Sequence, residues 1–222
     1  MEWKSFAEVN EIERRCTAQG NSAITCSQGC IRFLNVVENL YPYVCRLMIS
    51  TYLAMKTFLE SAKAKLNKQY KAMKPEAITT TVGLNIGKAV FDGVELNFWD
   101  LGGQKELQSL WDKYFAEAHG VIYIIDSSDQ SRIEESLDAF EKALKNKTLN
   151  GVPVVIVCNK QDIKECMSVS DVKMALREII KKLGTRDCSL FPVSALHGNN
   201  VLASISWLVK AIKKNSDYRP PS

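Results

Sequence analysis

A polar tetrapeptide, Asn159-Lys160-Gln161-Asp162, directly follows a uniformly apolar run that begins at Val152. An aspartate carboxylate accepts two parallel hydrogen bonds from the N1–H and the exocyclic amine of guanine, and adenine offers no such pair, so Asp162 is suited to select guanine. Asn159 can tie adjoining loops together, and the aliphatic stem of Lys160 can cover one face of a purine. Surface loops contain such tetrapeptides by chance, so the tetrapeptide alone is a weak signal. Here it stands at the end of a predicted buried strand, which favours the hypothesis that it binds guanine.

A second polar run, Asp100 to Gln104, leaves an earlier apolar stretch. An acidic residue at a strand end can hold Mg²⁺ through water, a following glycine lets a backbone N–H approach a phosphate oxygen, and a glutamine can orient an attacking water. In this hypothesis Asp100 is the acidic residue and Gln104 is the glutamine. The alternative is a tight turn made by Gly102 and Gly103 without a ligand.

A third segment, Ser194-Ala195-Leu196, follows the apolar residues Phe191 to Val193. Its backbone N–H groups can meet the carbonyl oxygen of guanine. Open α/β sheets bind ligands at the carboxyl ends of their strands, and all three polar segments stand at predicted strand ends. Each signal is weak alone, but in this order they predict a guanine nucleotide site.

The elements that must position these residues follow an alternating pattern from Val44 onward. Short apolar runs alternate with amphipathic helical patterns, which predicts an α/β fold: a six-stranded, mostly parallel sheet with helices on both faces. The runs Val121 to Ile125 and Val152 to Val157 are apolar throughout. Such runs are typical of central strands that are buried on both faces.

One turn and several helix ends have their own signatures. The dipeptide Asp92-Gly93 lies between Asn85 to Phe91 and Val94 to Trp99 and predicts one antiparallel hairpin. The last helix is expected over Val201 to Lys214, because apolar residues recur there at helical spacing.

Two segments have the pattern of a capping box. Ser131 to Glu134 is expected to open one helix, and Ser168 to Asp171 another.

The composition of the 222-residue chain is that of a globular protein, with 46% hydrophobic and 24% charged residues. A net charge of +4, without a concentrated basic stretch, argues against nucleic acid as a partner. Seven cysteines without a C-x-x-C spacing, and no apolar leader before Cys30, indicate the cytosol.

Three segments resemble the Arf branch of the Ras-like small GTPases: Thr79 to Asn85, Asn97 to Gln104 and Leu107 to Tyr114 look like its two switches and interswitch hairpin. The resemblance extends from Thr57 to Arg219 and weakly over Val44 to Lys56. We therefore expect an Arf-like domain at 44–219, an extension of unknown role at 1–43 and a tail at 220–222.

The resemblance implies the P-loop NTPase-like small-GTPase fold, GTP or GDP as ligand and Mg²⁺ as its metal. It implies that Thr81 binds Mg²⁺ and senses the γ-phosphate, that Gly103 donates its N–H to that phosphate, and that Gln104 positions the hydrolytic water. Asp100 would hold the outer shell of the metal. The guanine-recognising set would be Asn159, Lys160, Asp162, Ser194, Ala195 and Leu196.

The resemblance also implies partners. An effector surface would map to Leu84, Trp99 and Tyr114, with leucine a departure from the aromatic residue of the family; the alternative for these side chains is core packing. An exchange factor and a GTPase-activating protein are expected, because no arginine is evident to speed hydrolysis in cis. The expected function is a slowly hydrolysing GTP switch that regulates membrane trafficking and protein transport at the cytosolic face of the trans-Golgi, where the protein would be peripheral.

The chain departs from the family at the phosphate loop. The template G-x-x-x-x-G-K-[ST] meets Ser50 to Thr57, where serine and methionine replace both glycines while Lys56 and Thr57 survive. Either Lys56 binds phosphate and Thr57 binds Mg²⁺ in a degenerate loop, or both merely begin an amphipathic helix. Arg46 would also lie in a buried first strand, where an unpaired charge is costly.

Two further interpretations follow from this departure. In one, the protein is a nucleotide-independent pseudo-GTPase of the same fold that only binds partners. In the other, the residues before Thr57 derive from a misread exon.

Overall fold

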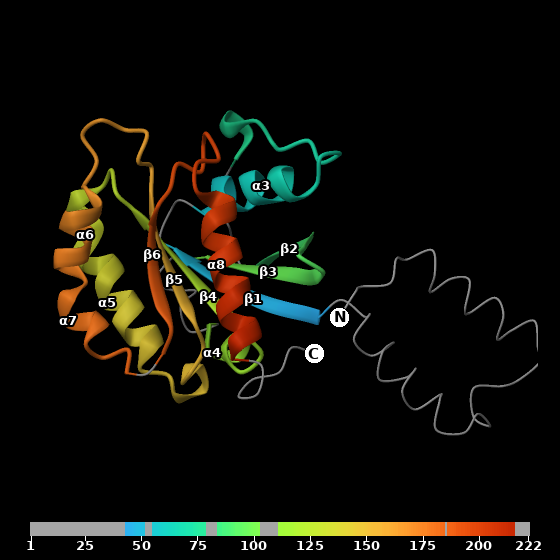
Figure 1. The fold of residues 1–222 in the computed structure, drawn as a ribbon. Coiled ribbons are helices and arrows are strands. Elements are labelled where there is room, and N and C mark those ends of the chain that lie inside the picture. The colour runs from blue at the N-terminus through green and yellow to red at the C-terminus, as the bar shows by residue number, and fades with distance from the viewer. Residues whose placement is uncertain (1–42, 52–54, 79–83, 103–110, 185, 216–222) are drawn as a thin grey trace, which may run out of the picture. The chain divides into compact units, whose positions relative to one another are not determined.

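The computed structural model describes residues 43–51, 55–78, 84–102, 111–184 and 186–215. Within them lies one six-stranded sheet in the order β2-β3-β1-β4-β5-β6 (Figure 1). The β2–β3 pair is antiparallel and the other pairs are parallel, so the predicted fold is confirmed. The strands are β1 (Tyr43–Thr51), β2 (Leu84–Phe91), β3 (Val94–Gly102), β4 (Gly120–Asp126), β5 (Val154–Asn159) and β6 (Cys188–Pro192). The division into an extension, a domain and a tail stays a prediction.

The predicted hairpin forms at Asp92-Gly93. Both residues have positive φ, 51° and 73°, which suits the two-residue turn that matches the twist of antiparallel strands. The pairing continues from Phe91↔Val94 to Leu84↔Leu101. The hairpin therefore extends past Trp99 and brings Asp100 to the carboxyl end of the sheet.

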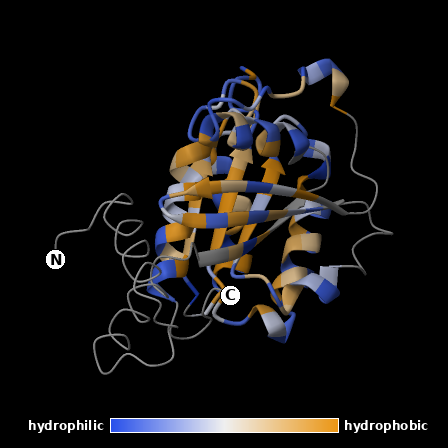
Figure 2. Cartoon of the chain, turned by 90° about the vertical axis from the view of Figure 1, so that its right-hand side faces the viewer, coloured by the Kyte–Doolittle hydropathy of each residue, from blue (hydrophilic) through white to orange (hydrophobic). Residues whose placement is uncertain are grey.

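Helices cover both faces of the sheet, and each face has its own apolar core. Helices α3 (Met55–Leu66) and α8 (Val201–Lys214) pack on one face. The other face is covered by α4 (Trp111–Phe115), α5 (Ile133–Leu144), α6 (Val169–Ala175) and α7 (Arg177–Ile180). Figure 2 shows apolar residues concentrated on the strands between these layers. No helix in the described ranges has the length and apolar character needed to cross a membrane.

Arg46 does not place an unpaired charge in the core, so that expectation was wrong. Alternation along β1 directs Cys45 and Leu47 into the core under α3 and α8, which leaves Arg46 on the opposite face. Its guanidinium lies 5.9 Å from the ring centroid of Trp99, and its Nε lies 3.5 Å from the carboxylate of Glu117. The half-exposed side chain is thus compensated by a ring and a carboxylate.

One capping box forms and the other does not. Ser168 Oγ accepts a hydrogen bond from the backbone N–H of Asp171, whose carboxylate accepts one from the N–H of Ser168. Ser131 makes no cap, because its hydroxyl and the side chain of Arg132 both donate to Asp129 and a 3-10 turn precedes α5. The predicted cap does not form because Asp129 accepts the hydrogen bond of the Ser131 hydroxyl.

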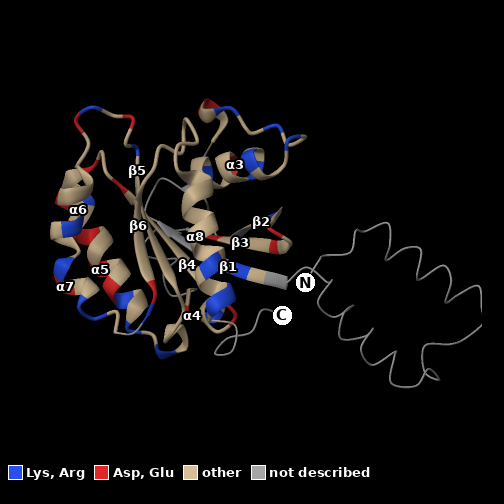
Figure 3. Ribbon diagram, viewed as in Figure 1, with Lys and Arg blue, Asp and Glu red and all other residues tan. Residues whose placement is uncertain are grey.

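The last helix begins and ends as predicted, and its apolar stripe is buried. Two lysines of its polar face are held by carboxylates of the domain itself: Lys213 Nζ lies 2.7 Å from Asp92 Oδ2, and Lys214 Nζ lies 3.1 Å from Asp187 Oδ2. In Figure 3 the ribbon is coloured blue, for lysine and arginine, near this end of α8. Lys213 thereby joins the helix to the hairpin turn.

Glu60, buried on α3, organises the segment that follows the helix. Its carboxylate accepts hydrogen bonds from the Tyr70 hydroxyl at 2.8 Å, the Met73 N–H at 2.9 Å and Lys63 Nζ at 3.0 Å. Burial raises the pKa of Glu60, but the hydrogen bonds from Met73, Lys63 and Tyr70 outweigh burial and leave the pKa below its usual range. The carboxylate thus fixes the course of the chain towards the 3-10 turn η1 (Pro75–Ala77).

We expect Glu60→Gln to lower the free energy of unfolding by about 1–3 kcal/mol at pH 7, because one charged acceptor of several buried hydrogen bonds is lost. Because the pKa of Glu60 is lower in the folded protein than in the unfolded chain, its carboxylate stabilises the fold fully at pH values above the unfolded pKa. This stabilisation is lost as the pH falls through the folded pKa. The difference between the two proteins should therefore shrink in acid. Urea unfolding at pH 7 and pH 4 measures it. Glu178→Gln, on an exposed side chain, is the control; an equal effect of both substitutions would contradict the assignment.

Candidate functional site

A cavity of about 350 Å³ opens at the carboxyl ends of β5 and β6, beside the first turn of α3. This volume is within the range of small-molecule sites. Its lining residues are Thr57, Pro75, Ile78, Asn159, Lys160, Asp162, Ile163, Ala195 and Leu196. The cavity therefore collects residues from four separate parts of the chain, among them most of the predicted guanine-recognising set.

Asn159 and Asp162 join the loops after β5 and β6. Asn159 is buried, and its Oδ1 accepts a hydrogen bond from the backbone N–H of Ala195 at 3.0 Å. The hydroxyl of Ser194 donates to Asp162 Oδ1 at 2.6 Å. One edge of the Asp162 carboxylate is thus held while the residue lines the cavity. This arrangement fits a guanine base, because a fixed carboxylate presents acceptors to two parallel donors.

Lys160 has a left-handed backbone conformation with φ of 65°, which side-chain-bearing residues rarely adopt. The neighbouring backbone is held on both sides: Gln161 N–H donates to Val193 O at 3.1 Å, and Ile163 N–H donates to Lys160 O at 3.1 Å. Lys160 Nζ forms an ion pair with Asp126 Oδ2 at 2.7 Å. The stem of Lys160 is thereby kept at the cavity.

The phosphate-loop region differs from the expected strand and loop. β1 was expected to end at Ile49, but it continues through Ser50 and Thr51, which pair with Leu101 and Gly102 of β3. Without a glycine at position 50, nothing favours the left-handed or otherwise unusual backbone that a phosphate-binding turn requires. Residues 52–54 lie outside the described part of the chain.

Thr57 and Asp100 are the described oxygen-bearing candidates for Mg²⁺. Thr57, in the first turn of α3 next to Lys56, lines the cavity, and Asp100 is buried near the end of β3. Hydroxyl and carboxylate oxygens suit Mg²⁺, so these residues fit the metal by their chemistry. Thr81, Gly103 and Gln104 lie outside the described residues. Within the described ranges, no three His, Cys, Asp or Glu side chains cluster as metal ligands.

The predicted effector residues are described in part. The rings of Trp99 and Tyr114 meet edge to face with centroids 5.2 Å apart, and Trp99 is buried in this conformation. Of Leu84 only the backbone, at the start of β2, is described. In this structure Trp99 packs against Tyr114 and Arg46, and the effector role of these residues stays a prediction.

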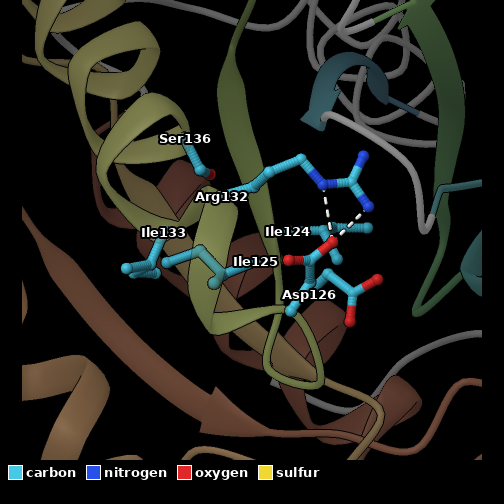
Figure 4. A pocket seen from close by; sticks show the side chains of 7 residues that line it. Ile124, Ile125, Asp126, Arg132, Ile133 and Ser136 are labelled. Carbon is cyan, nitrogen blue, oxygen red and sulfur yellow. Dashed lines mark hydrogen bonds and ion pairs between the residues drawn. The ribbon is translucent and has the colours of Figure 1, made fainter.

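Several residues at the site were not identified from the sequence. Pro75 and Ile78 reach the cavity through the course that Glu60 sets, which no local pattern shows. Asp126 ends β4 in register with Asn159, and this strand-end position could have identified it. Figure 4 shows Asp126 next to Arg132 at a smaller pocket beside the β4 end.

Residues 57–212 match the model of the ADP-ribosylation factor family. ADP-ribosylation factor-related protein 1 of Rattus norvegicus is 48% identical over 193 residues, which cover 84% of this chain and 96% of that protein. ADP-ribosylation factor-like protein 3 of Saccharomyces cerevisiae is 37% identical over 74% of this chain and 83% of its own length.

A solved structure has the same fold. The Arl6 small GTPase of Trypanosoma brucei, with a bound nucleotide analogue, covers 77% of this chain and 98% of its own length, with a TM-score of 0.65 and 22% identity. The family model, the relatives and the sheet order agree, and the chain belongs to the ADP-ribosylation factor family of small GTPases.

Proposed function

We propose that this protein is a guanine-nucleotide-dependent switch whose base pocket is intact and whose phosphate loop binds weakly. The observation that carries the proposal is the cavity in which Asp162, Ala195 and Thr57 meet. The Asp162 carboxylate recognises the edge of guanine, and Ala195 and Leu196 line the same cavity. The N–H groups of Ser194 and Ala195 are bound within the protein, to Asn199 O and Asn159 Oδ1. Membership of the family supports nucleotide-dependent switching.

The chemistry of the switch assigns separate tasks to this chain's residues. Thr57 and Thr81 would hold the metal, which would supply positive charge next to the phosphates, and Asp100 would bind its water ligands. Lys56 contacts phosphate, Gly103 donates its N–H to the γ-phosphate, and Gln104 orients the attacking water. Since no arginine is assigned to the transition state in cis, hydrolysis is slow and depends on a partner.

The proposed setting is the cytosolic face of the trans-Golgi, where an exchange factor loads the switch and effectors bind around Leu84, Trp99 and Tyr114. Relatedness to ADP-ribosylation factor-related protein 1 supports this setting. Because Trp99 is buried here, an effector can reach it only if the β2–β3 hairpin or the residues packed on Trp99 change position.

A second candidate is a nucleotide-independent binding module of the same fold. The observation that favours it is the continuation of β1 through Ser50 and Thr51, where a phosphate loop would begin. In this case the base pocket is a remnant and the partner surfaces carry the function.

The two candidates differ in calorimetric titrations with GDP and ADP. We expect GDP to bind the unaltered chain weakly and ADP more weakly by at least about tenfold, because adenine leaves the Asp162 carboxylate without its donors, at a cost of roughly 1–3 kcal/mol. Replacing Ser50 and Met55 together by glycine should strengthen Mg²⁺-dependent GDP binding, since the loop can then close around phosphate.

Each part of the proposal has its own contradicting result in these titrations. Equal binding of GDP and ADP would remove Asp162 from its role. Tight GDP binding by the unaltered chain would show that the missing glycines matter little. No gain in the double-glycine protein would favour the nucleotide-independent module.

Gln104→Leu should slow GTP hydrolysis by roughly 10²-fold or more in single-turnover measurements, because leucine cannot orient the attacking water. GDP affinity should be unchanged, since the side chain acts on the γ-phosphate side. Gln69→Leu, at an exposed position outside the site, is the control and should leave the hydrolysis rate unaltered. The same hydrolysis rate in the Gln104 variant and the unaltered protein would refute the assigned role.

A further inference from the structure

We infer that Asp126 is a positioning residue for the purine pocket: its carboxylate holds the Lys160 ammonium so that the Lys160 stem forms one wall. The inference rests on the proposed function and adds to it a residue outside the sequence motifs. Asp126 does not line the cavity, whereas Lys160 does. Any influence of Asp126 on the nucleotide therefore passes through Lys160.

The Asp126 carboxylate is fixed before it meets the lysine. Its Oδ1 accepts hydrogen bonds from the backbone N–H of Ser128 at 3.0 Å and from the Ser128 hydroxyl at 2.6 Å. Its Oδ2 lies 2.7 Å from Lys160 Nζ. One oxygen thus closes the turn after β4, and the other lies against the lysine. The side chain is only 15% exposed, which limits screening by solvent.

The nearby cation has a direct partner of its own. Arg132 is bound by Asp129, which also accepts the Ser131 hydroxyl. Figure 4 shows the Arg132 side chain joined by dashed lines to a carboxylate, with Asp126 alongside. Asp126 attracts Arg132 through space, but its direct ion pair is with Lys160.

Because the backbone of Lys160 is held in a left-handed conformation, the ion pair with Asp126 is enough to order its side chain. With φ fixed at 65° by the loop, the Cα–Cβ bond has a set direction, and only the side-chain torsions remain to be ordered. A free lysine stem samples many rotamers, which costs entropy when it packs on a base. The ion pair with Asp126 restricts those rotamers in advance, so the wall exists before the ligand arrives.

The test is a double-mutant cycle on Asp126→Asn and Lys160→Met, in which methionine keeps an apolar stem without the charge. GDP and inosine diphosphate affinities are measured by calorimetry, and thermal unfolding is measured without nucleotide. Asp126→Asn should weaken both nucleotides by the same factor, about 3- to 10-fold, because the stem covers a face of the purine and does not distinguish its edge. Asp162→Asn, in contrast, should weaken GDP more than inosine diphosphate, which lacks the exocyclic amine.

In the Lys160→Met background, Asp126→Asn should have no further effect on affinity, a result that a merely structural role would not give. Asp129→Asn, which breaks the neighbouring ion pair, is the matched control and should leave both affinities unaltered. An undiminished effect of Asp126→Asn in the Lys160→Met background, or an equal effect of Asp129→Asn, would overturn the inference. If the unaltered chain binds no GDP, the proposed function fails. The ion pair is then tested by thermal unfolding without nucleotide, where additive changes in unfolding temperature for Asp126→Asn and Lys160→Met would overturn the inference.

Discussion

The proposed base pocket depends on the hydrogen bond from the Ala195 N–H to Asn159 Oδ1, 3.0 Å long and buried from solvent. Water cannot replace either partner there, so losing one of them leaves a buried polar group unsatisfied. This bond and the one from the Gln161 N–H to Val193 O join the loop after β5 to the loop after β6. The joined loops bring Asp162 and Ser194 together at 2.6 Å, at the cavity that Lys160 also lines.

The two halves of the proposed nucleotide site have different origins in the fold. The base half is built by the ends of β5 and β6, strands held between apolar layers on both faces. The phosphate half belongs to the passage from β1 to α3, where Ser50 and Thr51 continue the strand. Because different elements carry them, one half can change while the other persists. A chain of this family can therefore keep its choice of base and lose phosphate affinity.

Structural features that depend on one interaction between neighbouring residues were predictable from the sequence. The Asp92-Gly93 turn needs two residues with positive φ, and α8, which ends at Lys214, follows from a single apolar stripe. Features decided by competition or by distant contacts were not. The Ser131 hydroxyl donates to Asp129 and does not cap the helix. Glu60 accepts a hydrogen bond from the Met73 N–H, more than ten residues away, and so directs the chain that carries Pro75 and Ile78 to the cavity. The ion pair of Asp126 was missed because its partner Lys160 is distant in sequence, although the place of Asp126 at the end of β4, in register with Asn159, could have identified it.

The cavity between Lys160 and Leu196 is proposed as a guanine site, and a crystal structure of the protein soaked at high concentration with GDP and Mg²⁺ would show whether the base binds there. We expect the purine within the 350 Å³ cavity, its N1–H and exocyclic amine facing the Asp162 carboxylate and the Lys160 stem along one ring face. A purine bound elsewhere, or one in the cavity with its amine turned away from Asp162, would rule this site out.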